Sequence, residues 1–324
     1  MPLVEARDLA KYFEVRQSVI GRLLGAKQQT LRAVDGVSFA ISEGETVGLV
    51  GESGCGKSTV TRCVVGLAQP TGGSVTFLGK DVVSMRGEDL RAFRRSVQIV
   101  FQNPYASLNP RKTVSQVLGQ AVRQTGVADP SEIDAEIARL LDSVGLRRNH
   151  SEMYPHQFSG GQRQRIAIAR ALAVKPRFLV CDEPVSALDV SVQAQILNLL
   201  MDLQAEYNLT YLIVAHDLGV IYQVCARVMI MYLGKVVESG PVQAVYDEPL
   251  HPYTRALLAS IPVLGPGGRE MRAALAGVPP SPADLPPGCR FNTRCSCAEP
   301  RCATAEPTLT EVSSGHEVAC FLHG

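Results

Sequence analysis

The chain has 324 residues, of which 46% are apolar, and a formal net charge of +1. This length suits one large domain with an appendage, and the apolar fraction is sufficient for a packed core. The near-neutral charge argues against a protein that coats nucleic acid, because such domains are usually clearly basic.

The segment from Met1 to Asp8 carries charged side chains where a signal peptide would place its apolar core. No apolar run approaches the roughly 18 residues that are required to cross a bilayer. We therefore expect a cytoplasmic protein, which leaves open whether it docks on a membrane protein.

Short β-branched runs alternate with longer helical patterns along the chain. The runs expected to form strands span residues 46–50, 98–101, 178–181 and 211–214, and the expected helices span 57–67 and 191–207. This alternation is typical of an α/β fold with a mostly parallel sheet that is covered by helices.

Two segments depart from this alternation. Residues 113–150 carry apolar side chains at helical spacing, which indicates an inserted helical subdomain over about residues 103–165. Residues 262–288 are rich in Pro and Gly and are typical of a linker. We therefore expect a domain of residues 1–260, followed by a C-terminal region of residues 261–324.

A phosphate-binding motif lies between the first expected strand and helix. The pattern G-x-x-x-x-G-K-[ST] is matched by Gly51, Glu52, Ser53, Gly54, Cys55, Gly56, Lys57, Ser58 and Thr59. Its glycines allow backbone N–H groups to surround phosphate oxygens, and the helix N-terminus adds a favourable dipole. Lys57 is expected to reach the β- and γ-phosphates of ATP, and the Ser58 hydroxyl to bind Mg²⁺. The alternative is a glycine-rich turn that matches by chance, and the flanking strand and helix argue against it.

Cys55 lies inside this motif, at a position where only the backbone is required. A thiol at a helix N-terminus is expected to have a lowered pKa. We therefore expect alkylation of Cys55 to block hydrolysis, and bound ATP to protect the thiol.

Polar side chains follow three other expected strands. Asp182 can hold Mg²⁺ through water, and Glu183 is placed to act as general base towards the attacking water. His216 can hydrogen-bond the γ-phosphate, and Gln102 can contact both Mg²⁺ and the water. Ligands bind at the carboxyl edge of open α/β sheets, which favours these roles over solvated acids and a structural histidine.

A second anion-binding helix terminus is indicated by Ser159, Gly160, Gly161 and Gln162, which precede the helical run 163–173. Ser159 is a candidate N-cap, and the two glycines would expose the first N–H groups of the helix. By itself the segment could be only a flexible turn.

Together, these motifs make the chain resemble the nucleotide-binding subunit of ATP-binding-cassette transporters over about residues 3–260. The resemblance implies a phosphate-loop ATPase cassette of α/β class, with a mostly parallel sheet, an antiparallel β part and the inserted helical subdomain. It also implies that two ATP molecules are sandwiched between two chains. Residues 159–162 of one chain would then cap the γ-phosphate held by the other, and the loop 186–189 would cross the interface. Phe13, or alternatively Tyr12, would stack on adenine.

The segment after the cassette narrows the resemblance. His251, Pro252 and Tyr253, the insertion at about residues 14–30 and a cysteine-rich tail resemble the ATPases of bacterial oligopeptide and dipeptide importers. This resemblance implies a second cassette subunit, identical or paralogous, two transmembrane permease subunits and, indirectly, an extracytoplasmic solute-binding protein. It implies a peripheral location on the cytoplasmic face of the plasma (inner) membrane, with a peptide, nickel, glutathione or another small solute as cargo.

Five of the nine cysteines lie near the C-terminus, in a segment expected to be small and irregular. Cys289, Cys295, Cys302 and Cys320 are separated by five, six and 17 residues, unlike the close pairs of structural zinc sites. This spacing favours a [4Fe–4S] cluster, with Zn²⁺ or unliganded thiols as alternatives. Cys297 could replace Cys295. The charge of a cluster could be offset by Arg290, Arg294 and Arg301, and in sequence the tail is far from the ATP motifs.

The rival interpretation is a soluble ATP-driven clamp that acts on nucleic acid or ribosomes without a membrane partner. The cassette motifs alone permit it. The near-neutral charge, the single cassette and the importer-like C-terminal region argue against it, so we expect no nucleic-acid partner.

Overall fold

The computed structural model describes residues 1–14, 30–103, 107–126, 129–260 and 277–323. Most of the expected insertion at residues 14–30 and much of the expected linker lie outside these ranges. The chain divides into two compact units. We call Met1–Leu3, Ile41–Thr46 and Ser84–Ala215 the helical unit, and Val4–Ala40, Val47–Val83 and His216–Gly324 the phosphate-loop unit.

Three parallel strands form the sheet of the helical unit. They are β6 (Val97–Val100), β7 (Phe178–Asp182) and β8 (Thr210–Ala215), with β7 in the middle. Every residue of β7 and β8 is buried. Their nearly continuous apolar sequences are therefore those of parallel strands covered on both faces.

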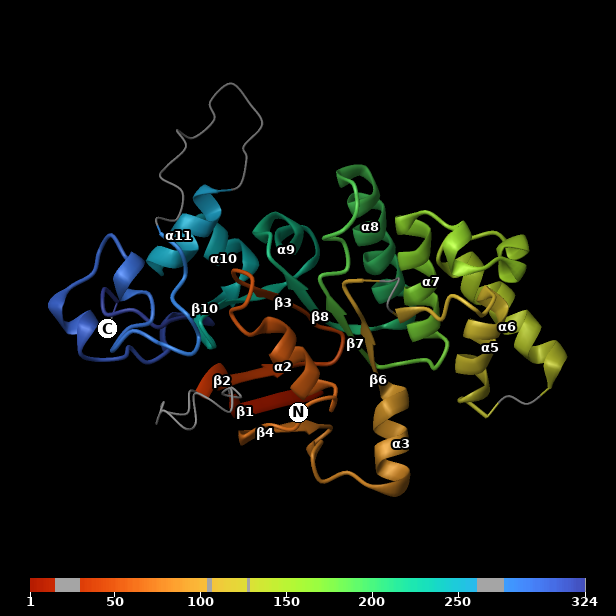
Figure 1. Cartoon of the computed structure of the whole chain (residues 1–324), viewed down its shortest axis with the longest axis horizontal. Coiled ribbons are helices and arrows are strands. Elements are labelled where there is room, and N and C mark those ends of the chain that lie inside the picture. The colour runs from red at the N-terminus through yellow and green to blue at the C-terminus, as the bar shows by residue number, and fades with distance from the viewer. Residues whose placement is uncertain (15–29, 104–106, 127–128, 261–276, 324) are drawn as a thin grey trace, which may run out of the picture. The chain divides into compact units, whose positions relative to one another are not determined.

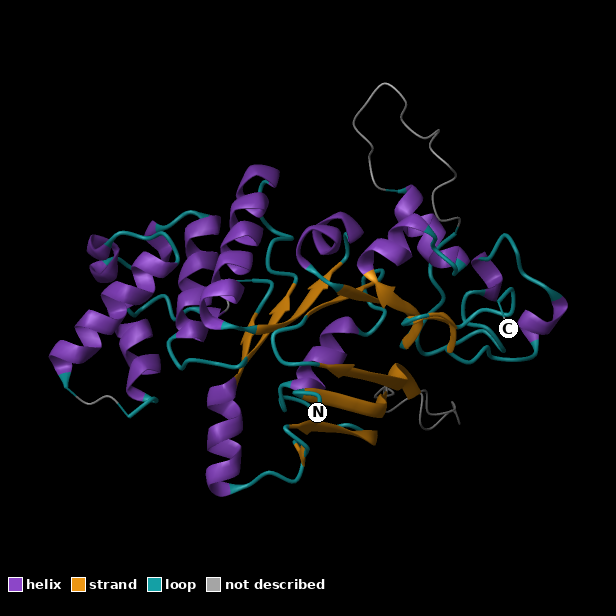
Figure 2. Cartoon of the chain, turned by 180° about the vertical axis from the view of Figure 1, so that it is seen from behind, coloured by secondary structure: helices purple, strands orange, loops and turns teal. Residues whose placement is uncertain are grey.

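The helices of this unit are α3 (Gly87–Ser96), α5 (Val114–Arg123), α6 (Pro130–Ser143), α7 (Gly160–Leu172) and α8 (Val190–Tyr207). A capping box between Thr113 and Gln116 starts α5, and Asp129 caps α6 immediately before Pro130. Helices α5, α6 and α7 pack on one another and lie side by side (Figures 1 and 2). The helices expected within residues 113–150 are therefore confirmed.

Short 3₁₀ turns connect the packed helices: η1 (Arg148–Glu152) and η2 (Pro155–Gln157).

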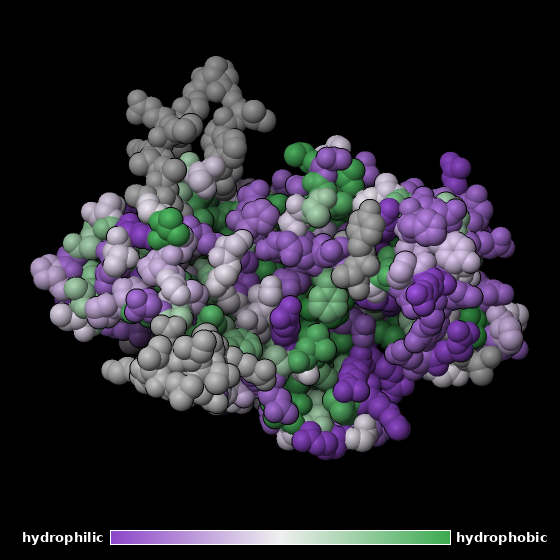
Figure 3. Space-filling view, viewed as in Figure 1, coloured by the Kyte–Doolittle hydropathy of each residue, from purple (hydrophilic) through white to green (hydrophobic). Residues whose placement is uncertain are grey.

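Hydrophilic side chains gather over α5, α6 and α7 on the face shown in Figure 3. The apolar side chains Val114, Leu118 and Leu141 are buried instead, as the helical spacing of the sequence predicts.

The phosphate-loop unit contains an antiparallel sheet in the order β2-β1-β4-β5. Its strands are β1 (Val4–Glu14), β2 (Thr30–Ile41), β4 (Gly72–Phe77) and β5 (Lys80–Asp81). A second group of strands comprises β3 (Thr46–Val50), β9 (Arg227–Tyr232) and β10 (Lys235–Pro241). Strand β3 is parallel to β9, and β10 is antiparallel to β9. The antiparallel part expected for the cassette is therefore present.

The helices of this unit are α2 (Lys57–Val64), α9 (Leu218–Val224), α10 (Val242–Asp247) and α11 (Pro252–Ala259). Helix α2 ends at Val64, before the expected boundary at residue 67. Gly66 follows with a positive φ of 72°, which is typical of a residue just beyond a helix end. Among the described residues, no helix is both long and apolar enough to cross a membrane.

The C-terminal region is more regular than expected. It contains the 3₁₀ turns η3 (Asn292–Arg294) and η4 (Pro300–Ala303) and the hairpin strands β11 (Thr310–Ser313) and β12 (His316–Val318). Strand β12 pairs with β10, and Figure 1 shows this segment in blue beside β10. The prediction of an irregular tail is therefore wrong for the hairpin, which gains backbone partners by extending β10.

A buried carboxylate on β10 stabilises the packing of this hairpin against β10. The side chain of Glu238 on β10 is fully buried and lies 2.8 Å from Nε2 of His316 on β12. It also accepts hydrogen bonds from the backbone N–H groups of Leu250 (2.8 Å) and His251 (2.9 Å). One carboxylate therefore joins β10, β12 and the start of α11, and its desolvation is compensated by hydrogen bonds.

Candidate functional site

The phosphate loop connects the buried strand β3 to α2, as the motif predicts. Gly54 and Gly56 adopt positive φ angles of 82° and 111°. A Cβ atom on Gly56 would lie 2.0 Å from the carbonyl oxygen of Ala33, and one on Gly51 would lie 2.1 Å from that of Met231. These glycines are therefore required both by backbone conformation and by close packing.

Lys57 lies inside the loop that precedes it. Its side chain is largely buried, and Nζ donates hydrogen bonds to the carbonyl oxygens of Gly51 (2.6 Å) and Glu52 (3.0 Å). Ser53 and Ser58 are exposed, and Thr59 is half-buried. The loop therefore combines an enclosed ammonium group, an accessible hydroxyl and a helix N-terminus, which together suit a phosphorylated ligand with its Mg²⁺.

The expectation of a lowered pKa at Cys55 is wrong. The residue is only 3% exposed, and burial raises the pKa of its thiol despite the ammonium group of Lys57, which lies 3.9 Å away. The sequence shows the helix N-terminus but not that the side chain points into the protein, where desolvation outweighs the favourable charge.

In the helical unit, the structure brings Gln102 and Glu183 together. Nε2 of Gln102 donates to Oε2 of Glu183 (2.8 Å) and lies 3.3 Å from Oγ of Ser186. Glu183 has a positive φ of 48°, and its N–H donates to the carbonyl oxygen of Val214 on β8. This backbone conformation is uncommon for a residue with a side chain and is concentrated at functional sites. Asp182, at the end of β7, is buried.

Ser159 is the N-cap of α7, as its position in the sequence predicts. Its hydroxyl accepts a hydrogen bond from the N–H of Gln162 (3.3 Å), and the Gln162 side chain accepts one from the N–H of Ser159 (3.0 Å). A Cβ atom on Gly161 would lie 2.4 Å from Cγ1 of Val192. The segment is therefore fixed by packing against α8 and is not a flexible turn. Its expected contact with a γ-phosphate stays a prediction.

His216 and Phe13 belong to the phosphate-loop unit. His216 directly follows β8 and precedes Asp217, whose side chain caps α9. Phe13 is 44% exposed at the end of β1, whereas the hydroxyl of Tyr12 is hydrogen-bonded to Asp35. Phe13, and not Tyr12, is therefore the ring that remains accessible to an adenine. The role of Phe13 in binding adenine and that of His216 in binding the γ-phosphate stay predictions.

The five C-terminal cysteines line one small cavity, together with His251 and Phe291. Their thiol chemistry suits an iron–sulfur cluster or zinc. Burial raises the pKa of the Cys289 and Cys320 thiols, and that of Cys295 to about 11. In the described ranges, however, no three His, Cys, Asp or Glu side chains are grouped to hold a metal ion. The donor types fit a metal site, and the metal itself stays a prediction.

The arginines near these cysteines have carboxylate partners. Arg290 pairs with Asp35 and Glu306, Arg294 pairs with Glu52, and Arg301 pairs with Glu299. The expectation that they offset the charge of a cluster missed these partners, which are remote in sequence in the first two cases.

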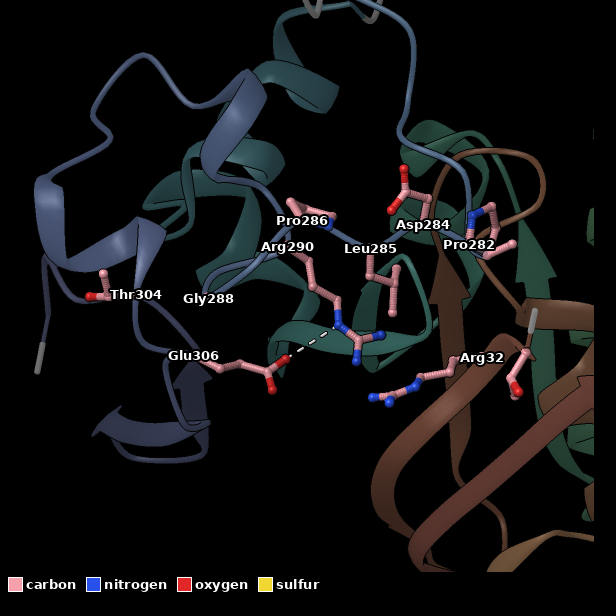
Figure 4. A pocket seen from close by; sticks show the side chains of 11 residues that line it. Arg32, Pro282, Asp284, Leu285, Pro286, Gly288, Arg290, Thr304 and Glu306 are labelled. Atoms are coloured by element: carbon pink, nitrogen blue, oxygen red, sulfur yellow. Dashed lines mark ion pairs between the residues drawn. The ribbon is translucent and has the colours of Figure 1, made fainter. Parts of the chain in front are cut away.

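A separate cavity of about 650 Å³ lies beside β2 and is lined by Arg32, Arg290, Asp284 and Glu306, among others. Figure 4 shows Arg290 and Glu306 joined by an ion pair within it, 3.3 Å between Nε and Oε1. Arg32 also lies 3.7 Å from Asp35. Both arginines of this cavity therefore have a carboxylate partner, and the cavity has none of the features of the phosphate loop.

Two families match the sequence. The family described as "ABC transporter" matches residues 34–186, and the family "Oligopeptide/dipeptide transporter, C-terminal region" matches residues 237–302. "Oligopeptide transport ATP-binding protein AppF" of Bacillus subtilis (strain 168) is 47% identical over 324 residues, covering 99% of this chain and 97% of the relative. The chain belongs to the ATP-binding subunits of ABC transporters, in the oligopeptide/dipeptide group.

Other relatives agree with this assignment. "Oligopeptide transport ATP-binding protein OppF" of Escherichia coli (strain K12) is 46% identical, covering 98% of this chain and 96% of the relative. The ATP-binding cassette MJ0796, solved as a dimer in a post-hydrolysis state with ADP and Pi, is 28% identical. It superposes with a TM-score of 0.64 over 74% of this chain and 98% of that chain. The ABC cassette fold and the family predicted from the motifs are thus confirmed.

Sequence reasoning missed the contacts that three residues make with the phosphate loop or with Gln102. They are Tyr253, Arg294 and Ser186. Tyr253 stood out only as part of the sequence His251-Pro252-Tyr253, and Ser186 only as part of the loop 186–189. Arg294 had no signal that connected it with the phosphate loop, because the two are 242 residues apart.

Proposed function

We propose that this chain is the ATP-hydrolysing subunit of an importer for oligopeptides or dipeptides. The observation that carries the proposal is an intact phosphate loop, with Lys57 enclosed by it, in a chain that matches peptide-transport ATP-binding proteins over nearly its whole length. The relatives do not favour a clamp that acts on nucleic acid or ribosomes.

In this proposal, Lys57 exchanges its two backbone acceptors for the β- and γ-phosphates of ATP. Mg²⁺, held by Ser58, Gln102 and Asp182, would neutralise charge that develops on the phosphates. Glu183 accepts a proton from the attacking water, and Gln102 holds its carboxylate by the 2.8 Å hydrogen bond. His216 donates a hydrogen bond to the γ-phosphate as charge accumulates there.

Dimerisation belongs to the same proposal. Two chains would enclose two Mg²⁺–ATP molecules, with the capped N-terminus of α7 of one chain facing the γ-phosphate held by the other. The rigid capping box of Ser159 and Gln162 supports such a role, because the exposed N–H groups are already arranged. The second chain would be identical or a paralogue.

Closure and reopening of the dimer would then drive the membrane partners. We propose that the subunit lies on the cytoplasmic face of the plasma membrane, bound to two permease subunits that receive peptide from an extracytoplasmic binding protein. The helices α5 and α6 are the expected contacts of the permeases, because they form the inserted helical part.

We further propose that Cys289, Cys295, Cys302 and Cys320 hold a [4Fe–4S] cluster, with Zn²⁺ as the alternative occupant. Their position around one cavity and their wide spacing support this assignment. The visible spectrum and iron content of anaerobically purified protein would test it. About four irons per chain are expected for the cluster, whereas a colourless protein with bound zinc, or with no metal, would contradict it.

The transport function can be tested by coexpressing the chain with candidate permease subunits from the same organism and measuring uptake of a labelled peptide. Uptake should require ATP and should be lost in Lys57→Ala. The matched control is Lys175→Ala, which changes an exposed lysine at a turn in the helical unit. ATP hydrolysis without any peptide uptake would contradict the importer assignment but leave the ATPase assignment intact.

A further inference from the structure

The phosphate loop is held by Tyr253, near the end of the expected domain of residues 1–260, and by Arg294 of the C-terminal region. The backbone N–H of Glu52 donates to the hydroxyl of Tyr253 on α11 (2.9 Å). The carboxylate of Glu52 accepts hydrogen bonds from both terminal nitrogens of Arg294 on η3, at 2.7 and 3.0 Å. Glu52 is therefore fixed through its backbone by α11 and through its side chain by η3, and both elements lie C-terminal to the cassette motifs.

The ion pair between Arg294 and Glu52 is bidentate and well shielded. The Arg294 side chain is only 4% exposed and that of Glu52 is 23% exposed. The hydrogen bonds to Glu52 raise the pKa of Arg294. Two parallel charge-assisted hydrogen bonds with little competing water fix both the distance and the orientation of the two groups.

An aromatic cluster supports Arg294 and Tyr253. The rings of Tyr232, Tyr253 and Phe291 pack with centroid distances of 4.7–5.5 Å. Nη1 of Arg294 also lies 3.3 Å from the hydroxyl of Tyr232. All three rings are nearly fully buried, so the side chains that contact Glu52 come from a packed core and not from a loose tail.

Glu52 is directly connected to the lysine that is expected to bind phosphate. Its carbonyl oxygen accepts a hydrogen bond from Nζ of Lys57 at 3.0 Å. A shift of Glu52 would therefore move an acceptor of Lys57 and the strand-to-helix turn in which both residues lie.

A second arginine of the same segment supports the other side of the loop. Arg290 donates to the carbonyl oxygen of Leu233 and pairs with Asp35. The next residue, Gly234, donates its N–H to the carbonyl oxygen of Cys55 (2.8 Å). Figure 4 shows Arg290 reaching out from the C-terminal segment, away from its backbone.

Both arginines are bracketed by cysteines of the cavity. Cys289 directly precedes Arg290, and Cys295 directly follows Arg294. The N–H of Cys289 donates to the carbonyl oxygen of Cys302 (2.8 Å). Only five residues separate Cys289 from Cys295, and both arginines are among them. The conformation of the cysteine segment therefore determines where the two guanidinium groups lie.

We propose that Arg294 is a positioning residue for the phosphate loop, and that residues 289–295 make the affinity for ATP depend on the folded state of the cysteine segment. This inference rests on the proposed role of the phosphate loop as the ATP site. The segment 289–295 would then control the ATP site from outside the cassette motifs.

The experiment measures the Kd of the full-length protein for Mg²⁺ and the fluorescent analogue N-methylanthraniloyl-ATP, and the KM and kcat of ATP hydrolysis. Arg294→Ala should raise both Kd and KM about tenfold, as expected for loss of a shielded charged pair, with kcat changed less than about twofold. Arg294→Lys should lose less, because one hydrogen bond to the carboxylate can persist.

A charge-swap pair tests the contact itself. Glu52→Arg and Arg294→Glu should each weaken nucleotide binding, and the double variant should bind more tightly than either single variant. The matched control is Arg139→Ala, which removes a bidentate Arg–Glu pair on the exposed surface of α6. Its Kd should equal that of the wild type. Circular dichroism and thermal melting establish that each variant is folded.

A Kd for folded Arg294→Ala within twofold of the wild-type value would overturn the inference. If this variant is unfolded, the charge swap decides: a double variant no better than the weaker single variant also overturns it. Lys57→Ala separates this failure from failure of the ATP site. If wild type and Lys57→Ala bind the analogue equally, the site assignment itself is wrong.

Discussion

The two sets of residues expected to act on ATP are stabilised in different ways. In the helical unit, Gln102 and Glu183 contact each other directly across a sequence separation of 81 residues, and both belong to recognised motifs. In the phosphate-loop unit, Glu52 is held by Arg294 across 242 residues, by a segment outside the cassette motifs. The first arrangement is specified by the motifs themselves, and the second depends on an appended region.

This difference shows that a complete sequence motif does not contain all of the residues that fix its geometry. The glycines of the phosphate loop give it the required backbone freedom, and the same freedom leaves its geometry to be fixed by neighbours. In this chain those neighbours include the C-terminal region, which belongs to the same compact unit as the loop. Four predictions test how different the two arrangements are.

The largest effect is expected at Glu183. Glu183→Gln keeps the hydrogen-bonding shape but removes the base, so hydrolysis should fall by on the order of 100-fold or more, while ATP binding persists. Size-exclusion chromatography with Mg²⁺–ATP should then show a trapped dimer. Glu206→Gln makes the same chemical change at an exposed position of α8 and should leave the rate unchanged. Hydrolysis by Glu183→Gln at the wild-type rate would rule out this base.

A tenfold effect is expected from the cysteine segment. Cys295→Ser should remove the proposed metal ligand that adjoins Arg294, and should raise the Kd for the ATP analogue about as much as Arg294→Ala does. Metal content should fall in the same variant. Cys297→Ser alters the exposed thiol that is the alternative to Cys295; with Cys295 as the ligand, it should change neither quantity. Equal affinities of Cys295→Ser and the wild type would show that the loop does not depend on this ligand.

A smaller effect is expected from the titration of His251. Burial lowers the pKa of this imidazole to about 3 from its usual 6.5, with His323 and Arg255 nearby adding to the shift. Its neutral form accepts a hydrogen bond from the N–H of Tyr253. The stability from this neutral group is complete above pH 6.5 and is lost as the pH falls towards 3, because the unfolded chain then binds a proton that the folded chain excludes.

His251→Asn keeps an N-cap acceptor but does not titrate in this range. The variant should melt a few degrees below the wild type at pH 7, because it loses packing against Phe291. Between pH 7 and pH 4 its melting temperature should fall less than that of the wild type. Parallel pH profiles for the two proteins would contradict the shifted pKa.

The smallest effect is expected at Cys55. Because its thiol is buried and its pKa is raised, N-ethylmaleimide at pH 7 should leave it unmodified in the folded protein. Peptide mass mapping can compare it with Cys297, which is exposed and serves as an internal control. Modification of Cys55 as fast as that of Cys297 would show that the loop opens readily and is not firmly held.

Sequence reasoning succeeded where a motif and its flanking elements agree. The strand–loop–helix around Lys57, the N-cap at Ser159 and the strand that ends at Asp182 all follow from short-range patterns. The pairing of Arg294 with Glu52 could not be predicted, because no local pattern encodes a contact over that sequence distance. The burial of Cys55 could not be predicted either, because exposure depends on the neighbouring chain segments.

The hairpin of β11 and β12 was missed for a different reason. Its strands are only four and three residues long, and Thr310–Ser313 is exposed and mostly polar. The turn residues Ser314 and Gly315, with a φ of 70° at Gly315, were the one available signal. Such short strands gain stability from β10, so their own propensity is a weak guide.

The buried carboxylate of Glu238 has a consequence for how chains of this kind diverge. Its acceptor sites are taken by two backbone N–H groups and by the imidazole of His316. A descendant that lost the hairpin would leave a charged group in an apolar interior with one partner missing. The two positions should therefore change together, so that relatives without a histidine-bearing hairpin carry a smaller or uncharged residue in place of Glu238.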